Sequence, residues 1–144
     1  MTPAARLAAA IEVFGNLESE RRPAADALKS WGLAHRFAGS GDRAAIAGLV
    51  YDALRRRASS AYLMGADTPR AILLGMLKRE RAHDTEAIAK LADGSNYGPA
   101  ALSDDERQRL VATDMAGAPA HVAGDYPEWL DPHFTRAFGD ARAE

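Results

Sequence analysis

The stretch "TPRAILLGML", residues 68–77, decides the fold that this sequence predicts. Thr68 can cap a helix, and Pro69 suits the first helical position, where a missing N–H costs nothing. The positions that follow are apolar on most sides of that helix: Ala71, Leu73, Leu74, Met76 and Leu77. A helix that is apolar nearly all round is normally buried, so we expect this one to lie at the centre of the core.

Amphipathic segments on both sides of this stretch predict the helices that cover it. Three are expected before it: Thr2–Pro3 to a stop at Gly15–Asn16, Pro23 to Trp31 with Gly32 as the stop, and an N-cap at Asp42 through Arg57. Two are expected after it: a short helix capped by Asp84 or Thr85, and one that begins with the capping box Ser103 to Glu106. No credible pair of strands is present. The pattern therefore predicts an all-α helical bundle.

Length and composition fit one ordinary domain. The chain has 144 residues and no cysteine, which excludes disulfides and thiolate metal sites within it. Its longest apolar runs fall far short of the ~20 residues that a membrane span requires. The N-terminus also lacks the layout of a signal peptide. We therefore expect a cytoplasmic location and no membrane partner.

Charge is distributed unevenly along the chain. Residues 1–81 hold 13 Lys and Arg against 8 Asp and Glu, a net of +5, whereas residues 82–144 hold 5 against 12, a net of −7. Such an asymmetry indicates either one charged face or an uneven but merely solvated surface.

Arginine clusters in the basic half are the candidate RNA contacts. Guanidinium groups bind phosphate bidentately and stack on bases, and the best-placed ones are Arg21, Arg22, Arg55 and Arg56. The competing interpretation is structural, because helix C-termini attract basic residues in any protein. Arg57 faces the apolar stripe of its helix, so we expect it to be a paired arginine at the edge of the core rather than a ligand-binding residue.

No enzyme chemistry is indicated within the chain. The four histidines are scattered without metal-ligand spacing, and no serine sits in a G-x-S-x-G elbow. The stretch "GSGD", residues 39–42, lacks the preceding strand and the Gly-Lys-Ser/Thr ending of a phosphate loop, so a turn is the better interpretation. We predict no catalytic, cofactor-binding or metal-binding residue.

The C-terminal stretch "GDYPEWLDPHFTRAFGD", residues 124–140, holds four of the ten aromatic residues. Proline restricts the residue before it to extended conformations, which predicts a stiff connector, followed by a helix from Asp131–Pro132 to Phe138. A tryptophan ring gains stability from burial. We therefore expect Trp129 to dock on the bundle, with Phe134 and Phe138 more exposed.

Five stretches, taken in order, resemble one family. They are "RLAAAIEVF" (6–14), "RPAADALKSWG" (22–32), "DRAAIAGLVYDALRRR" (42–57), "TPRAILLGML" (68–77) and "YPEWLDPHFTRAFGD" (126–140). Together they are similar to the N-terminal NusB-like domain, and the connector after it, of the RsmB/Sun family of RNA methyltransferases. The resemblance covers nearly the whole chain.

The resemblance implies a NusB-like helical RNA-binding domain over residues 1–120. Residues 121–144 would then begin the link to a methyltransferase domain in cis, which uses S-adenosylmethionine to methylate C5 of a cytosine in small-subunit ribosomal RNA. The chain has no cysteine, so no family catalytic residue can be carried over, and we expect this part of the protein to be no enzyme by itself. The expected partners are ribosomal RNA and the appended domain. The alternative is a NusB-like protein-interaction module, acting in transcription antitermination or as a scaffold.

Overall fold

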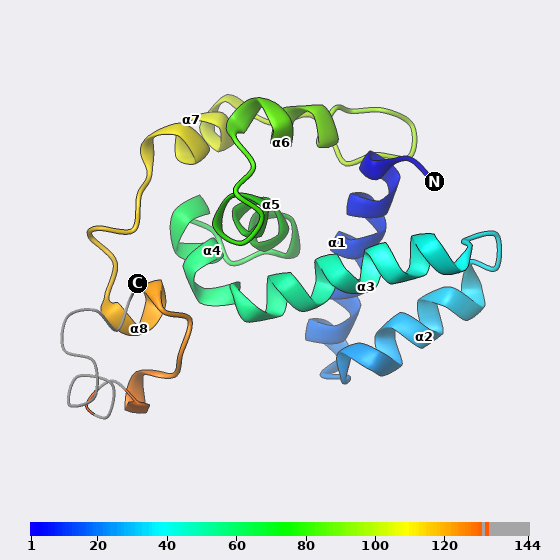
Figure 1. The fold of residues 1–144 in the computed structure, drawn as a ribbon, viewed down its shortest axis with the longest axis horizontal. Coiled ribbons are helices and arrows are strands. Elements are labelled where there is room, and N and C mark those ends of the chain that lie inside the picture. Colours follow the sequence, from blue (N-terminus) through cyan, green and yellow to red (C-terminus); the bar gives the residue numbers. More distant parts are fainter. Residues whose placement is uncertain (131, 133–144) are drawn as a thin grey trace.

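The computed structural model describes residues 1–130 and residue 132, and within them the protein is all-helical (Figure 1). Its helices are α1 (Pro3–Glu20), α2 (Ala24–Ala34), α3 (Ser40–Arg55), α4 (Arg57–Met64), α5 (Pro69–Arg79), α6 (Thr85–Leu91), α7 (Asp104–Ala112) and α8 (Ala120–Ala123), followed by the 3-10 turn η1 (Glu128–Leu130). The prediction of an all-α bundle is confirmed. The narrower NusB-like assignment stays a prediction.

Helix α5 lies at the centre of the bundle. Residues 71–77 are all buried, and α5 contacts α1, α3, α4 and α6. Figure 1 views it nearly end-on, in the middle of the other helices. The hydroxyl of Thr68 accepts a hydrogen bond from the N–H of Ala71 at 3.2 Å, as the capping signal predicts. The stretch at 68–77 therefore plays the central role expected of it.

Helices α4 and α5 approach each other with almost no space between their backbones. A Cβ atom added at Gly75 would lie 2.7 Å from both Cβ and the carbonyl oxygen of Ser60. Only a glycine allows this crossing, because real Cβ atoms are essentially never found that close to backbone. Gly75 thus sets the distance between the central helix and α4.

The predicted helix through Arg57 is wrong at its end, and α4 was not expected from the sequence. Helix α3 stops at Arg55, and Arg56 adopts φ −111° and ψ 24°, which turns the chain before α4 begins. No glycine or proline marks this break. The turn instead lets α4 fold back over α5, burying Leu63 and Met64.

The predicted ends of two helices are also wrong, because each was placed at a glycine. Helix α1 continues through Gly15 to Glu20, because Leu17 prolongs its buried stripe, and it ends at Arg21 with φ 52°. Helix α2 likewise continues past Gly32 to Ala34. In both helices the glycine fills an interior position, so it does not act as a stop.

The start of α3 differs from the prediction by three residues. The N-cap is Gly39, and Asp42 occupies the third helical position, from which its carboxylate accepts a hydrogen bond from the N–H of Gly39 at 3.4 Å. Asp42 therefore caps the helix from inside its first turn.

The C-terminal connector reaches the bundle, but not through its tryptophan. Trp129 is 70% exposed, so the prediction that it docks is wrong. The attachment lies earlier in the chain, where Ala123 is buried and Asp125 is hydrogen-bonded to α4. Phe134 and Phe138, together with the helix predicted around them, lie outside the described residues. The predicted boundary at residue 120 also stays a prediction.

None of the helices among the described residues has the length and apolar character needed to cross a membrane.

Candidate nucleic-acid interface

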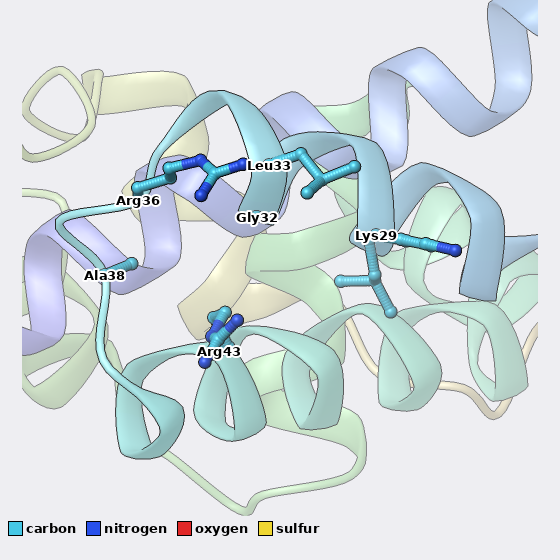
Figure 2. A pocket seen from close by; sticks show the side chains of 7 residues that line it. Lys29, Gly32, Leu33, Arg36, Ala38 and Arg43 are labelled. Carbon is cyan, nitrogen blue, oxygen red and sulfur yellow. The ribbon is translucent and has the colours of Figure 1, made fainter.

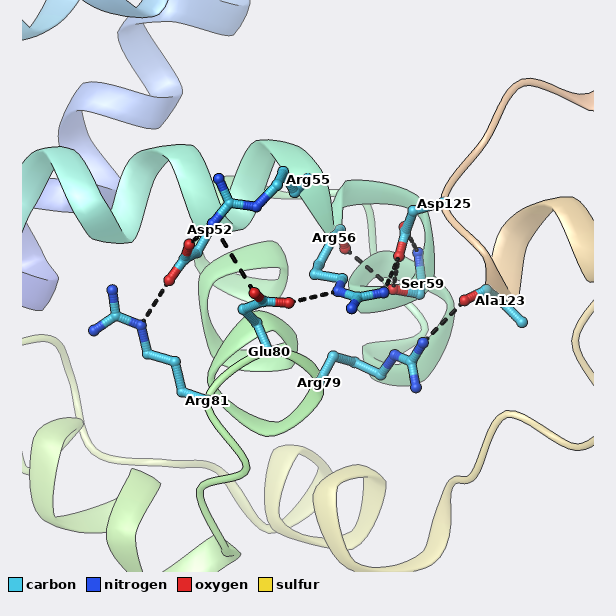
Figure 3. Close-up of polar contacts among 9 residues, drawn as sticks. All are labelled: Asp52, Arg55, Arg56, Ser59, Arg79, Glu80, Arg81, Ala123 and Asp125. Atoms are coloured by element: carbon cyan, nitrogen blue, oxygen red, sulfur yellow. Dashed lines mark hydrogen bonds and ion pairs between the residues drawn. The ribbon is translucent and has the colours of Figure 1, made fainter. Parts of the chain in front are cut away.

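The arginines predicted to bind RNA at the α3–α4 junction are engaged by carboxylates (Figure 3). Arg56 Nε donates to Glu80 Oε2 at 2.8 Å, and its guanidinium lies 3.6 Å from Asp125. Arg55 pairs with Asp52 and reaches Glu80 at 4.0 Å. The hydrogen bond between Arg56 and Glu80 lowers the pKa of Glu80 and raises the pKa of Arg56. The carboxylates in this network therefore largely neutralise the charge of these two arginines.

Part of this network fastens the C-terminal segment to the bundle. Asp125 accepts hydrogen bonds from the backbone N–H of Ser59 at 2.7 Å and from its hydroxyl at 2.6 Å. Arg79 donates to the carbonyl oxygen of Ala123 at 2.9 Å. Lys78 donates in the same way to the carbonyl oxygen of Leu110 at 2.5 Å. The basic end of α5 therefore acts within the protein, as a set of donors to α7 and to the segment that follows it.

Arg57 is paired, as predicted, although it belongs to α4 and not to a continued α3. Its guanidinium lies 2.9 Å from Glu18 and 2.9 Å from Asp67. Hydrogen bonding to Glu18, ahead of the charge of Asp67, raises the pKa of Arg57. The pair with Glu18 ties the end of α1 to the start of α4.

The other two predicted arginines lie between α1 and α2. Arg22 pairs with Glu20 at 3.2 Å and also donates to Ser30 Oγ at 2.7 Å. Arg21 is exposed, with no side-chain partner among the described residues. Three of the four predicted RNA contacts therefore already hold a carboxylate, and only Arg21 does not. Their assignment stays a prediction.

Several lysines and arginines, Arg21 among them, have no partner among the described residues. Within residues 1–130, the basic side chains with neither an ion pair nor a hydrogen bond are Arg21, Lys29, Arg36, Arg43, Lys90 and Arg109. Three of these, Lys29, Arg36 and Arg43, line one open groove of about 460 Å³ between α2 and the start of α3. Figure 2 shows Arg36 at the end of α2 and Arg43 rising from α3, which places them on opposite sides of the groove.

Local sequence and one distant contact together explain why Arg43 has no partner among the described residues. The positions three and four residues from Arg43 on α3 carry no carboxylate. Its neighbour Asp42 is occupied by Arg6, whose Nε donates at 2.9 Å and whose hydrogen bond lowers the pKa of Asp42. Gly32 leaves room for the stem of Arg43, because a Cβ there would meet Arg43 Cδ at 3.4 Å.

Sequence reasoning missed this groove, although a signal was available. Arg36 and Arg43 both lack an acidic residue at helical spacing, whereas Arg55 has Asp52 three residues before it. Weighing clusters of arginine by their carboxylate neighbours, and not by their density alone, would have favoured the α2–α3 side.

Chemically, the groove suits phosphate binding. Three unpaired cations in an open groove can each hold a phosphate oxygen, and guanidinium does so bidentately. The "GSGD" stretch itself is no phosphate cradle, because the Asp42 carboxylate already caps it. Among the described residues, no group of His, Asp and Glu is arranged to hold a metal ion.

Comparison of the chain with protein-family models, with curated proteins and with solved structures finds no match. The resemblance to the RsmB/Sun family therefore rests on the quoted stretches alone.

Proposed function

We propose that this protein is an RNA-binding helical module, which holds backbone phosphates in the groove between α2 and α3. The observation that carries the proposal is the convergence of Lys29, Arg36 and Arg43, none of which has a partner among the described residues. Such cations bring no internal carboxylate that a phosphate would have to displace, so their full charge is available to a polyanion.

The resemblance supplies the wider context of the proposal. An N-terminal NusB-like domain would present small-subunit ribosomal RNA, in the cytoplasm, to an appended methyltransferase that uses S-adenosylmethionine. The overall charge of −2 gives the protein no general attraction to nucleic acid. Binding must therefore depend on where the free cations lie, which makes the groove the decisive feature.

The salt dependence of binding tests the proposal. For single-stranded RNA, a plot of log K for binding against the logarithm of the salt concentration has a slope of roughly −0.7 for each phosphate that the protein neutralises. Replacing Lys29, Arg36 and Arg43 together with alanine should reduce the magnitude of that slope by about 2 and weaken binding at low salt. The measurement is fluorescence anisotropy of a labelled ribosomal RNA fragment between 50 and 200 mM salt, conditions in which such slopes are resolved.

Two controls sharpen the experiment. Replacing Lys90 and Arg109 with alanine removes cations that are equally unpaired but lie outside the groove, and should change the slope far less. Replacing Arg21, Arg22, Arg55 and Arg56 with alanine tests the prediction from sequence. Unchanged affinity in the groove variant, with circular dichroism showing a folded protein, would refute the proposed site. Capture of a protein from lysate without RNA affinity would favour the interaction-module alternative instead.

A further inference from the structure

A second hollow also borders the α2–α3 connection, and several of its lining residues are aromatic. Its volume is about 670 Å³, and its floor is formed by the small side chains Ala5, Ala8 and Ala9 of α1. The lining rings are those of Trp31, His35, Phe37 and Tyr97. Phe37 is 75% exposed and Tyr97 is 82% exposed. Two large rings are thus held open to solvent at the rim of a cavity.

The rings behind the rim are held in a fixed arrangement. His35 stacks on Trp31 with ring centroids 4.2 Å apart and planes 10° from parallel, while Phe37 meets His35 edge-on at 5.9 Å. The Nδ1 atom of His35 lies 2.8 Å from the carbonyl oxygen of Trp31, which fixes the orientation of the imidazole. A platform with its rings already ordered loses little conformational entropy when another ring stacks on it.

The aromatic hollow and the phosphate groove share one short segment of chain. His35 and Phe37 line the hollow, whereas Arg36 between them lines the groove. A nucleic-acid strand also alternates between the two kinds of group, because each nucleotide joins a flat base to a charged phosphate. A strand that crosses residues 35–37 can therefore place a phosphate at Arg36 and a base against Phe37.

We propose that the aromatic hollow binds an unpaired base of the RNA strand, by stacking on Phe37 and Tyr97. This inference rests on the proposed function and narrows its substrate to single-stranded RNA, since a paired base has no free face to offer. Aromatic rings beside a basic groove are the usual means by which proteins hold single strands.

The lining of the hollow favours a base over other occupants. Glu12 is an exposed carboxylate on its α1 side, which repels a phosphate but can accept hydrogen bonds from the N–H edge of a base. The neighbouring free cations suit an anionic strand and give no advantage to an uncharged apolar peptide. A base joined to its phosphate satisfies both features at once.

Substitution of Phe37 tests the inference directly. Stacking on one ring typically changes affinity by about fivefold to a hundredfold or more. The Phe37→Ala and Phe37→Leu variants should bind a single-stranded RNA at least roughly fivefold more weakly, with the salt slope unchanged, because no phosphate contact is lost. Phe37→Trp keeps an aromatic face and should bind like the wild type. Val111→Ala removes an equally exposed apolar residue elsewhere and serves as the matched control.

A base analogue gives a second readout. A strand carrying 2-aminopurine should lose fluorescence on binding the wild type, through stacking, and should lose less of it when bound to Phe37→Leu at saturating protein, where only Tyr97 remains to stack. The same sequence as a duplex should bind more weakly, and a DNA strand shows whether the ribose contributes.

The outcomes separate the two proposals. If the groove variant loses affinity while Phe37→Leu binds like the wild type, phosphate binding holds and base stacking is refuted. A duplex that binds as tightly as the single strand also refutes stacking. If the wild type binds no RNA, both proposals fail. Saturable binding of an apolar peptide that Phe37→Leu retains and Phe37→Ala loses would assign the hollow to a protein partner.

Discussion

Replacing Gly75 with alanine should strongly destabilise the protein. The new Cβ would lie 2.7 Å from Ser60 Cβ, 2.7 Å from its carbonyl oxygen and 2.8 Å from its Cα. Carbon atoms normally rest about 3.5–4.0 Å apart, so α4 and α5 would have to separate by roughly 1 Å. Two of the three opposing atoms belong to the backbone, so a change of rotamer cannot relieve the contact.

The size of the effect follows from two opposing terms. Overpacking a core costs about 1–3 kcal/mol, and a clash against the backbone of a buried helix belongs at the upper end. Alanine gains about 1 kcal/mol over glycine in a helix interior. The net loss is therefore about 2 kcal/mol. In a chain of this length it corresponds to a decrease in Tm of roughly 4–8 °C.

Thermal unfolding followed by circular dichroism measures this change, and Gly41→Ala is the control. Gly41 also lies in a helix, but a Cβ there meets nothing within 4 Å. That variant should keep or raise the stability, by up to about 1 kcal/mol. If Gly75→Ala unfolds at or above the wild-type temperature, the close crossing of α4 and α5 is not as described.

Two further predictions concern polar contacts. Ser59→Ala should cost about 1.5–3 kcal/mol in urea unfolding, because it leaves the Asp125 carboxylate, 5% exposed, without its hydroxyl donor. Ser60→Ala should be neutral or stabilising, because that buried hydroxyl has no hydrogen-bond partner in the part of the chain that the structure describes, and equal losses in the two variants would contradict the assignment. Hydrogen bonding to Arg70 lowers the pKa of Glu106 in the folded state, so its contribution is complete above the pKa of unfolded glutamate and is lost as pH falls through the lowered value. Arg70→Met should therefore lose less stability between pH 7 and pH 3 than the wild type, and an equal loss would count against the pair.

Local signals in the sequence predicted the elements that depend on local chemistry. The capping box of α7 is present in full, with Ser103 N–H donating to Glu106 at 3.0 Å and Glu106 N–H donating back to Ser103 Oγ at 3.1 Å. The buried character of α5 followed equally from its composition. Both signals lie within a few residues of the feature that they predict, so no tertiary information was needed.

Features that depend on distant residues were missed. The break at Arg56 follows from packing against α5, and the partner of that arginine, Glu80, lies 24 residues away in the chain. Sequence density of arginine could not show that this charge is already neutralised. The free state of Arg43 depends in the same way on Arg6, which occupies Asp42. Which cations are available to a ligand is therefore a tertiary property of the fold.

The length of α3 sets the distance between the phosphate groove and the C-terminal connector. The helix begins beside the phosphate groove and ends at the junction where Arg56 meets Asp125, and Figure 1 shows these ends on opposite sides of the bundle. Its 16 residues span about 24 Å at 1.5 Å per residue. Under the proposed function, the bound strand and the departing connector are thus held apart by the length of one rigid helix. A catalytic domain joined beyond the connector would have to cross that distance to reach the nucleotides in the groove.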